Sequence, residues 1–197
     1  MSVPSDNRAI LTTGLPNLYC TGPADALLPH KGIMFPNLPD ISYSQSVQYT
    51  PYDLVHTNYS FSSYRNTPSP DIILTGMFAQ TTDEEHRYLQ GVIHFLRCVT
   101  KMFYGINERD PAPGTPPPVL RFSAFGTNVF KNIPVLVQNF SVNIDSNTDL
   151  KTVDGQSLST IQTVTMNLIV QQSPARQKTR FSMAEFSSGN LYQEGFI

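Results

Sequence analysis

Four histidines are the side chains that could most readily bind a metal ion. His30, His56, His86 and His94 form neither an HxxxH nor an HExxH pair. His86 and His94 lie eight residues apart, which on a helix places them two turns apart, too far to share one ion. The sequence therefore predicts no metal site.

Ser123 is the candidate nucleophile, but its surroundings do not suit that role. The segment Phe122-Ser-Ala-Phe-Gly126 lacks the first glycine of a GxSxG elbow, and no helix is expected after it. The glycines form neither a GxGxxG nor a Walker loop, so no phosphate cradle is expected. Asp83 and Glu85 are paired carboxylates that a helix N-terminus explains. We expect no catalytic residue, no cofactor and no enzymatic activity.

The composition is poor in charge. Charged residues make up 14% of the 197 residues and apolar residues 40%, whereas an average soluble domain has about 25% charged residues. The remainder is rich in Ser, Thr, Asn, Gln and Pro, which favours strands and turns. With a net charge of −2, no specific nucleic-acid binding is expected. The one basic cluster, Arg176, Lys178 and Arg180, is interpreted as solvated surface.

The two cysteines and the hydropathy pattern indicate the kind of cellular compartment in which the chain folds. Cys20 and Cys98 lack CxxC spacing and are interpreted as reduced thiols. The N-terminus has no basic region followed by an apolar stretch, and no apolar run approaches 18 residues. We expect a soluble protein without a standard signal peptide and without membrane contact.

Residues 1–40 contain six prolines and three glycines, which predict an extended N-terminal arm with little regular structure. The segment is too apolar for a free tail and is expected to lie on another surface. Residues 41–197 are predicted to form a single β domain.

Alternation of apolar and polar residues with a period of two begins at Ile41. It predicts one strand over 41–49, a turn at 51–53, a second strand over 54–61 and a buried third strand over 71–80. The three strands would form a meander.

Residues 82–104 change to a helical period, and a single amphipathic helix is predicted there. Thr82 and Glu85 form a capping box, and Gly105 is placed as the residue after the C-cap. The apolar face is formed by Tyr88, Leu89, Val92, Ile93, Leu96, Val99 and Phe103.

A proline-rich loop over 110–118 separates this helix from further strands. Strands are predicted over 119–125, 136–144 and 163–170, with a polar loop at 145–156. Ser182 and Glu185 could open a short helical turn near the C-terminus. The order predicts a mainly β fold, an antiparallel sandwich or barrel with one long helix packed outside.

Aromatic residues gather in the first two predicted strands. They could form a platform that stacks sugars or bases, but cross-strand pairs and core packing are the favoured interpretation. The residues are Tyr43, Tyr49, Tyr52, Tyr59, Phe61 and Tyr64.

Seven stretches carry a recognisable family pattern: ISYSQSVQY (41–49), YDLVHTNY (52–59), LTGMFAQTT (74–82), HFLRCVTKM (94–102), PPPVL (116–120), NIPV (132–135) and QNFSV (138–142). Together they resemble the tube-initiator, or tail-tube junction, family found in baseplates of contractile-tailed phages. The resemblance covers about residues 36–145 and weakens towards the C-terminus.

The resemblance implies a tail-tube fold and a structural virion protein in the tail baseplate, assembled in the cytoplasm of the bacterial host. Such subunits form a sixfold ring between the baseplate hub and the first ring of tail-tube protein. A second initiator ring, or a sheath or wedge initiator, would be a further partner. The strands would join into a lumen wall through which DNA passes without being held.

Two other functions fit the residues. A carbohydrate-binding or adhesive β-sandwich is supported by the tyrosine-rich strands and the scarcity of charge, and a cryptic hydrolase is a third possibility. If the ring hypothesis is right, the helix and the polar loops 51–53 and 145–156 are expected contact regions, with simple solvent exposure as the alternative.

Overall fold

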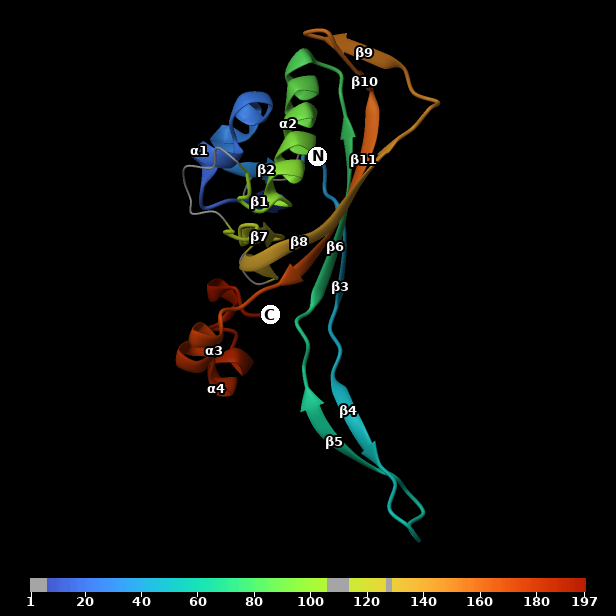
Figure 1. The fold of residues 1–197 in the computed structure, drawn as a ribbon, viewed down its shortest axis with the longest axis vertical. Helices are drawn as coiled ribbons and strands as arrows, with labels where there is room; N and C mark the ends of the chain where they lie inside the picture. The colour runs from blue at the N-terminus through green and yellow to red at the C-terminus, as the bar shows by residue number, and fades with distance from the viewer. Residues whose placement is uncertain (1–6, 106–113, 127–128) are drawn as a thin grey trace.

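The computed structural model describes residues 7–105, 114–126 and 129–197, and an antiparallel sheet of seven strands lies at its centre (Figure 1). The order across the sheet is β2-β1-β7-β8-β11-β6-β3, so the last strand in sequence is an inner one. The strands are β1 (Ile10–Thr12), β2 (Gly32–Met34), β3 (Asp40–Ser44), β6 (Asp71–Ala79), β7 (Leu120–Ala124), β8 (Phe130–Ile144) and β11 (Ile161–Val170).

The chain is mainly β, as predicted, but the sheet is not a closed barrel. Its edges, β2 and β3, follow one another in sequence and yet lie on opposite sides of the sheet. The connection between them passes through Pro36 and Pro39, which have no N–H to donate to a strand ladder. The barrel form of the prediction is therefore wrong.

Helix α2 (Asp83–Val99) covers one face of the sheet (Figure 1). The predicted capping box is confirmed. The backbone N–H of Glu85 donates to Thr82 Oγ1 at 3.2 Å, and the N–H of Thr82 donates to Glu85 Oε2 at 2.8 Å. Leu89, Val92 and Leu96 are fully buried against the sheet, in agreement with the predicted helical face.

The helix is shorter than the predicted range of 82–104, and Gly105 does not follow its C-cap. Thr100 is the C-cap, and its hydroxyl donates to the carbonyl of Leu96 at 2.9 Å. Beyond it, the N–H of Phe103 donates to the carbonyl of Thr115 at 3.0 Å, and the N–H of Gly114 donates back to the carbonyl of Phe103 at 2.7 Å. Pairing with the chain at 114–115 thus replaces the last helical turn. Residues 110–113 of the predicted proline-rich loop lie outside the described residues.

The N-terminal segment is not an extended arm. Residues 10–34 contain β1, helix α1 (Pro16–Tyr19), 3₁₀ helix η2 (Gly22–His30) and β2. β1 pairs with β7 inside the main sheet, and Leu27 of η2 is fully buried against α2. Gly91 makes this packing possible, since a Cβ there would lie 3.1 Å from the carbonyl oxygen of Pro23. Leu11, Leu27 and Ile33 are fully buried in the core of the same chain, whereas other leucines of the segment, such as Leu15 and Leu28, are exposed.

Strands β3 and β6 continue beyond the sheet as a separate pair, β4 (Gln48–Tyr52) and β5 (Phe61–Asn66). The predicted strand at 54–61 and turn at 51–53 are therefore displaced. Pro51 stays within β4, where a missing N–H is tolerated because both strands are edges. The turn lies after β4, because the Thr57 hydroxyl donates to the carbonyl of Leu54 at 2.9 Å and His56 has a φ of 65°.

The predicted polar loop 145–156 contains a second small hairpin, β9 (Leu150–Val153) and β10 (Gln156–Ser159). Asp154 and Gly155 form its turn with φ values of 52° and 76°, the left-handed conformation that favours Asp-Gly in tight hairpins. Lys151 Nζ lies 3.0 Å from Asp83 Oδ1, and Arg87 Nε lies 2.9 Å from Asp154 Oδ2. These ion pairs tie the hairpin to α2.

The C-terminal part folds into α3 (Pro174–Arg180), α4 (Met183–Ser187) and the 3₁₀ turn η3 (Tyr192–Glu194). The expected turn after Ser182 is confirmed as α4, with Ser182 as its N-cap residue. Helix α3 was not predicted, although Ser173 followed by proline is a helix start signal, and its hydroxyl accepts from the N–H of Arg176 at 3.2 Å.

Candidate functional site

Residues 45–66, here called the projecting hairpin, extend away from the sheet beyond β3 and β6 (Figure 1). Eight of their large apolar side chains are exposed, from 46% for Val47 to 89% for Tyr59. The eight are Val47, Tyr49, Tyr52, Leu54, Val55, Tyr59, Phe61 and Tyr64. An exposed apolar surface of this kind is typical of an interaction site.

Backbone pairing and a few polar contacts hold the projecting hairpin in shape. The rings of Tyr49 and Tyr64 meet edge to face across the strands, with centroids 6.2 Å apart. The Tyr64 hydroxyl lies 3.1 Å from Thr67 Oγ1, and the Tyr43 hydroxyl donates to Gln45 Oε1 at 2.7 Å. Cross-strand pairing is thus confirmed for Tyr49 and Tyr64. The prediction of core packing is wrong, because all six aromatic residues named from the sequence are exposed.

A groove of about 580 Å³, here called the C-terminal groove, lies at the base of this hairpin. One wall is formed by Tyr64 and the prolines of residues 67–70, and the other by α3, α4 and the residues around them. Phe181 contacts Phe186 and Phe196, with ring centroids 5.7 and 5.8 Å away. The side chains that line the groove include no Asp, Glu, Lys, Arg or His.

Basic residues of α3 flank this groove. Arg176 and Arg180 both contact Glu194, and the hydrogen bond from Arg180, together with both positive charges, lowers the pKa of that carboxyl. Lys178 is exposed, and none of the ion pairs among the described residues involves it.

The face of the main sheet opposite α2, here called the open face, carries no covering element in the described part of the chain (Figure 1). Thr75 and Thr165 meet on it, with their hydroxyls 3.3 Å apart. On β3, β6, β11 and residues 136–144 of β8, the charged residues of this face are acidic, whereas on β7 Arg121 lies on the same face, between the buried Leu120 and Phe122. On those first four strands, the residues that alternate with the buried ones to form the face are Asp40, Ser42, Ser44, Asp71, Ile73, Thr75, Met77, Ala79, Leu136, Asn139, Ser141, Asn143, Ile161, Thr163, Thr165, Asn167 and Ile169.

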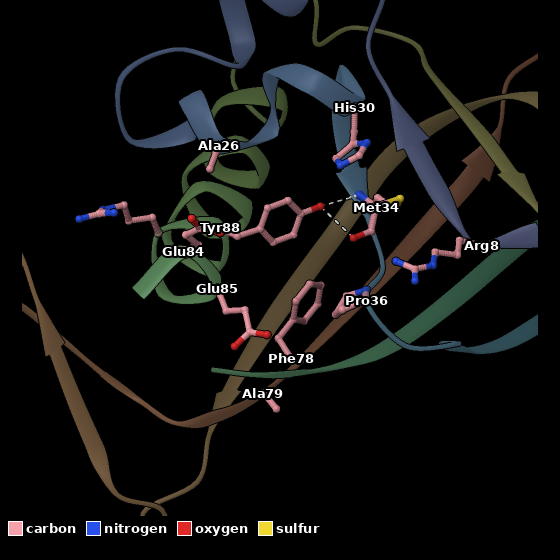
Figure 2. Close-up of a pocket in the computed structure, with 11 residues that line it drawn as sticks. Arg8, Ala26, His30, Met34, Pro36, Phe78, Ala79, Glu84, Glu85 and Tyr88 are labelled. Carbon is pink, nitrogen blue, oxygen red and sulfur yellow. Dashed lines mark hydrogen bonds between the residues drawn. The ribbon is translucent and has the colours of Figure 1, made fainter. Parts of the chain in front are cut away.

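A second cavity, of about 460 Å³, lies beside the N-terminal half of α2 (Figure 2). Tyr88 points across it, where its hydroxyl donates to the carbonyl of Met34 at 2.8 Å and accepts from the N–H of Met34 at 2.7 Å. Burial raises the pKa of Tyr88 to about 12. The phenol therefore stays protonated at neutral pH, and its evident role is to join α2 to β2.

The residues considered for chemistry lie apart. His30 ends η2, His56 lies in the turn of the projecting hairpin, and His86 and His94 lie on α2. His86 is fully buried, with Nε2 3.2 Å from Gln90 Nε2, on the same face of α2 as Leu89. Ser123 lies on β7, where its hydroxyl accepts from the N–H of Asn132 at 2.9 Å.

Among the thiols, Cys98 Sγ lies 3.5 Å from His94 Nε2 on α2. Among the described residues, no three His, Cys, Asp or Glu side chains group closely enough to hold a metal ion. Both cysteines carry free thiols, and burial raises the pKa of Cys20.

Neither protein-family models nor curated proteins give a match to this chain. Within the described residues, no helix has the length and apolar character needed to cross a membrane.

Proposed function

We propose that the chain is a structural virion protein of a contractile-tailed phage, a subunit of a sixfold baseplate ring that joins the hub to the tail tube and initiates tube polymerisation. Its partners would be further copies of itself, the tail-tube protein, and the hub or a second initiator ring. This proposal includes the tail-tube type of fold, in which the antiparallel sheet and its covering helix form one unit of a tube wall.

The projecting hairpin is the observation that carries the proposal. Its exposed apolar side chains bury little in a monomer, and burying one of them on a partner contributes about 1.5–3 kcal/mol. The hairpin also has free strand edges on both sides, which in a monomer are an aggregation hazard. In a subunit that is always incorporated into an assembly, neighbouring proteins would cover both the exposed apolar side chains and the free strand edges.

The open face supports the same role. A lumen that conducts DNA without retaining it must offer few cations to the phosphates, because Lys and Arg contacts dominate nonspecific DNA affinity. Over β3, β6, β11 and residues 136–144 of β8, the open face is rich in Ser, Thr and Asn, and its charged residues there are Asp40 and Asp71. If six sheets line the lumen through this face, DNA would meet a hydrated surface that repels it weakly.

Other contact regions would complete the ring. Residues 51–53, expected from the sequence to make contacts, belong to the projecting hairpin. Helix α2 and the β9–β10 hairpin within 145–156 remain candidates for ring-to-ring contacts.

Electron microscopy of the purified protein, alone and mixed with its cognate tube protein, tests the proposal. We expect hexameric rings or short stacks, and faster tube formation when the rings are present. Mass photometry would count the subunits independently. Protein that stays monomeric at high concentration and does not accelerate tube assembly would overturn the proposal.

A carbohydrate-binding or adhesive module is the alternative that a specific observation favours, because exposed tyrosines such as Tyr52 and Tyr59 could stack on sugar rings. It predicts a small oligomer that binds glycans, with affinity lost in Tyr59→Ala. The ring proposal predicts no glycan binding by the wild-type protein.

A further inference from the structure

Two uncovered apolar surfaces lie at opposite ends of the same hairpin. At the tip, Leu54, Val55 and Tyr59 are 62%, 82% and 89% exposed. At the base, Phe181 and Met183 in the C-terminal groove are 46% and 68% exposed. Between them runs an extended chain of about 25 Å, at about 3.3 Å per residue over residues 45–52. The tip therefore cannot reach the groove of its own molecule.

We infer that the tip of the projecting hairpin of one copy docks in the C-terminal groove of a second copy. This inference rests on the proposed function and names two of the surfaces that meet when the subunits assemble. Because the two surfaces differ, the contact is head-to-tail, and repeating it gives a closed ring when the rotation between neighbours closes.

The chemistry of the two surfaces matches. The groove has no Asp, Glu, Lys, Arg or His in its lining, and the tip between β4 and β5 offers large apolar groups, with Asp53 as its acidic residue and His56 as its histidine. Because the lining of the groove carries no Asp, Glu, Lys, Arg or His, the apolar side chains of the tip can enter it without burying an unpaired charge of the groove.

One pair of opposite charges would fix the orientation in which the tip of one copy sits in the groove of the next. Lys178 follows the groove residue Gln177 on α3 and lies one turn before Phe181. Arg176 and Arg180 contact Glu194, whereas neither Lys178 nor Asp53 takes part in an ion pair among the described residues. With the tip seated in the groove, Asp53 of one copy would meet Lys178 of the next. Paired charges at the edge of an interface contribute specificity and association rate.

Charge reversal tests this pairing. Asp53→Lys and Lys178→Asp are each expected to weaken self-association about 10-fold, measured by sedimentation velocity, because each places like charges opposite one another. Combining both changes in one chain should return the association constant to within about 3-fold of wild type. Lys31→Asp, at an exposed position between η2 and β2 and outside the proposed contact regions, is the matched control and should leave association unchanged.

Cross-linking tests the docking directly. Val55→Cys and Met183→Cys both change exposed side chains, so folding should be preserved. When the two variants are mixed under mild oxidation, a dimer linked between positions 55 and 183 is expected. Each variant alone and the wild type, with its own Cys20 and Cys98, serve as controls and should give no such species.

The outcomes separate this inference from the proposed function. Rescue by the double charge reversal, together with cross-linking confined to the mixture, supports the docking. If the wild type forms rings that nucleate tubes while every variant assembles normally, the docking is wrong and the ring function stands. Loss of tube nucleation in Asp53→Lys with normal self-association would place the tip on another protein and overturn the docking. A wild type that stays monomeric overturns both.

Discussion

The long hairpin formed by residues 40–79 has two halves that differ in burial, although both alternate polar and apolar residues. In the half inside the sheet, Ile72, Leu74 and Phe78 of β6 are buried because α2 and the N-terminal segment cover that face. In the outer half, the alternating residues of β4 and β5 are exposed on both sides. Alternation predicts a strand, but a second layer is needed to bury one of its faces.

The difference in burial means that apolar side chains contribute to folding in one half of the hairpin and to assembly in the other. Inside the sheet, an apolar residue contributes to the free energy of folding. On the projecting hairpin, a residue of the same type contributes little until a partner covers it. Stability and assembly should therefore respond to mutation in different regions of the molecule.

The largest effect is expected in the covered half of the fold. Phe95 of α2 is fully buried in the core, so Phe95→Ala should lower the free energy of unfolding by about 3–5 kcal/mol through lost burial and the cavity left behind. Urea denaturation followed by circular dichroism measures this change. A loss below about 1 kcal/mol would mean that α2 is not an essential cover of the sheet.

The same substitution in the projecting hairpin should act on assembly. Phe61 is 69% exposed, so Phe61→Ala should change the free energy of unfolding by less than about 0.5 kcal/mol. It should weaken self-association about 30-fold, the effect of removing a central aromatic anchor worth about 2 kcal/mol. Sedimentation velocity and urea denaturation of the same sample measure both quantities. Ser62→Ala, at the next position of β5, is the control, and equal effects of the two variants on assembly would argue against an aromatic anchor.

A smaller effect is expected where the covering helix begins. Thr82→Ala removes the acceptor for the N–H of Glu85 and should cost about 1 kcal/mol. Hydrogen bonds from the N–H groups of Thr82 and Thr81 lower the pKa of Glu85 below its ordinary 4.5. A carboxyl with a lowered folded-state pKa stabilises the fold above its unfolded pKa and loses that contribution as pH falls through the folded value.

It follows that wild type should be more stable than Glu85→Gln at pH near 7 and that the difference should shrink below about pH 4. Urea denaturation of both proteins at neutral and acidic pH measures it. A difference that does not depend on pH would show that the carboxylate charge plays no part in the cap.

The smallest effect is expected at the β9–β10 hairpin, which is a two-stranded ribbon like the projecting hairpin but is tied to α2. The side chains of Arg87 and Asp154 are 52% and 66% exposed, so water and salt screen their ion pair. Arg87→Gln should lower the melting temperature only slightly at low ionic strength and not measurably at about 0.15 M salt. A large decrease in melting temperature that persists at about 0.15 M salt would show that the ion pair is not screened and that it stabilises the fold.

Local patterns in the sequence were sufficient to predict the elements that depend on local signals. The helical period and the Thr82–Glu85 capping box predicted where α2 begins, and the strands near 71–80, 119–125, 136–144 and 163–170 lie close to observed ones. The Asp154-Gly155 dipeptide is also a hairpin signal, although the polar composition of residues 145–156 predicts only a loop there.

Features that depend on distant contacts were not predicted. The end of α2 depends on Phe103 pairing with residues 114–115, and helix η2 forms despite Pro23 and Pro29 because it packs on α2 at Gly91. Alternation of apolar and polar residues predicts core packing for the aromatic residues at 49–64. They are exposed because β4 and β5 lie outside the part of the sheet that α2 and the N-terminal segment cover, and no local pattern in the sequence reveals this. For the same reason, the sequence places only residues 51–53 of the projecting hairpin among the expected contact regions and does not predict the exposed apolar surface around them.

The position of β11 in the sheet has a consequence for folding during synthesis. β11 (Ile161–Val170) pairs with β6 on one side and with β8 on the other. Strands β6 and β8 therefore lack β11 as a pairing partner until residue 170 has left the ribosome. Pairings between strands so far apart in the chain close slowly. The projecting hairpin, in contrast, is made from residues 45–66 and can pair early. Its apolar tip would then be presented before the rest of the fold is complete, so fast handover to a chaperone or to an assembled partner would protect the nascent chain from aggregation.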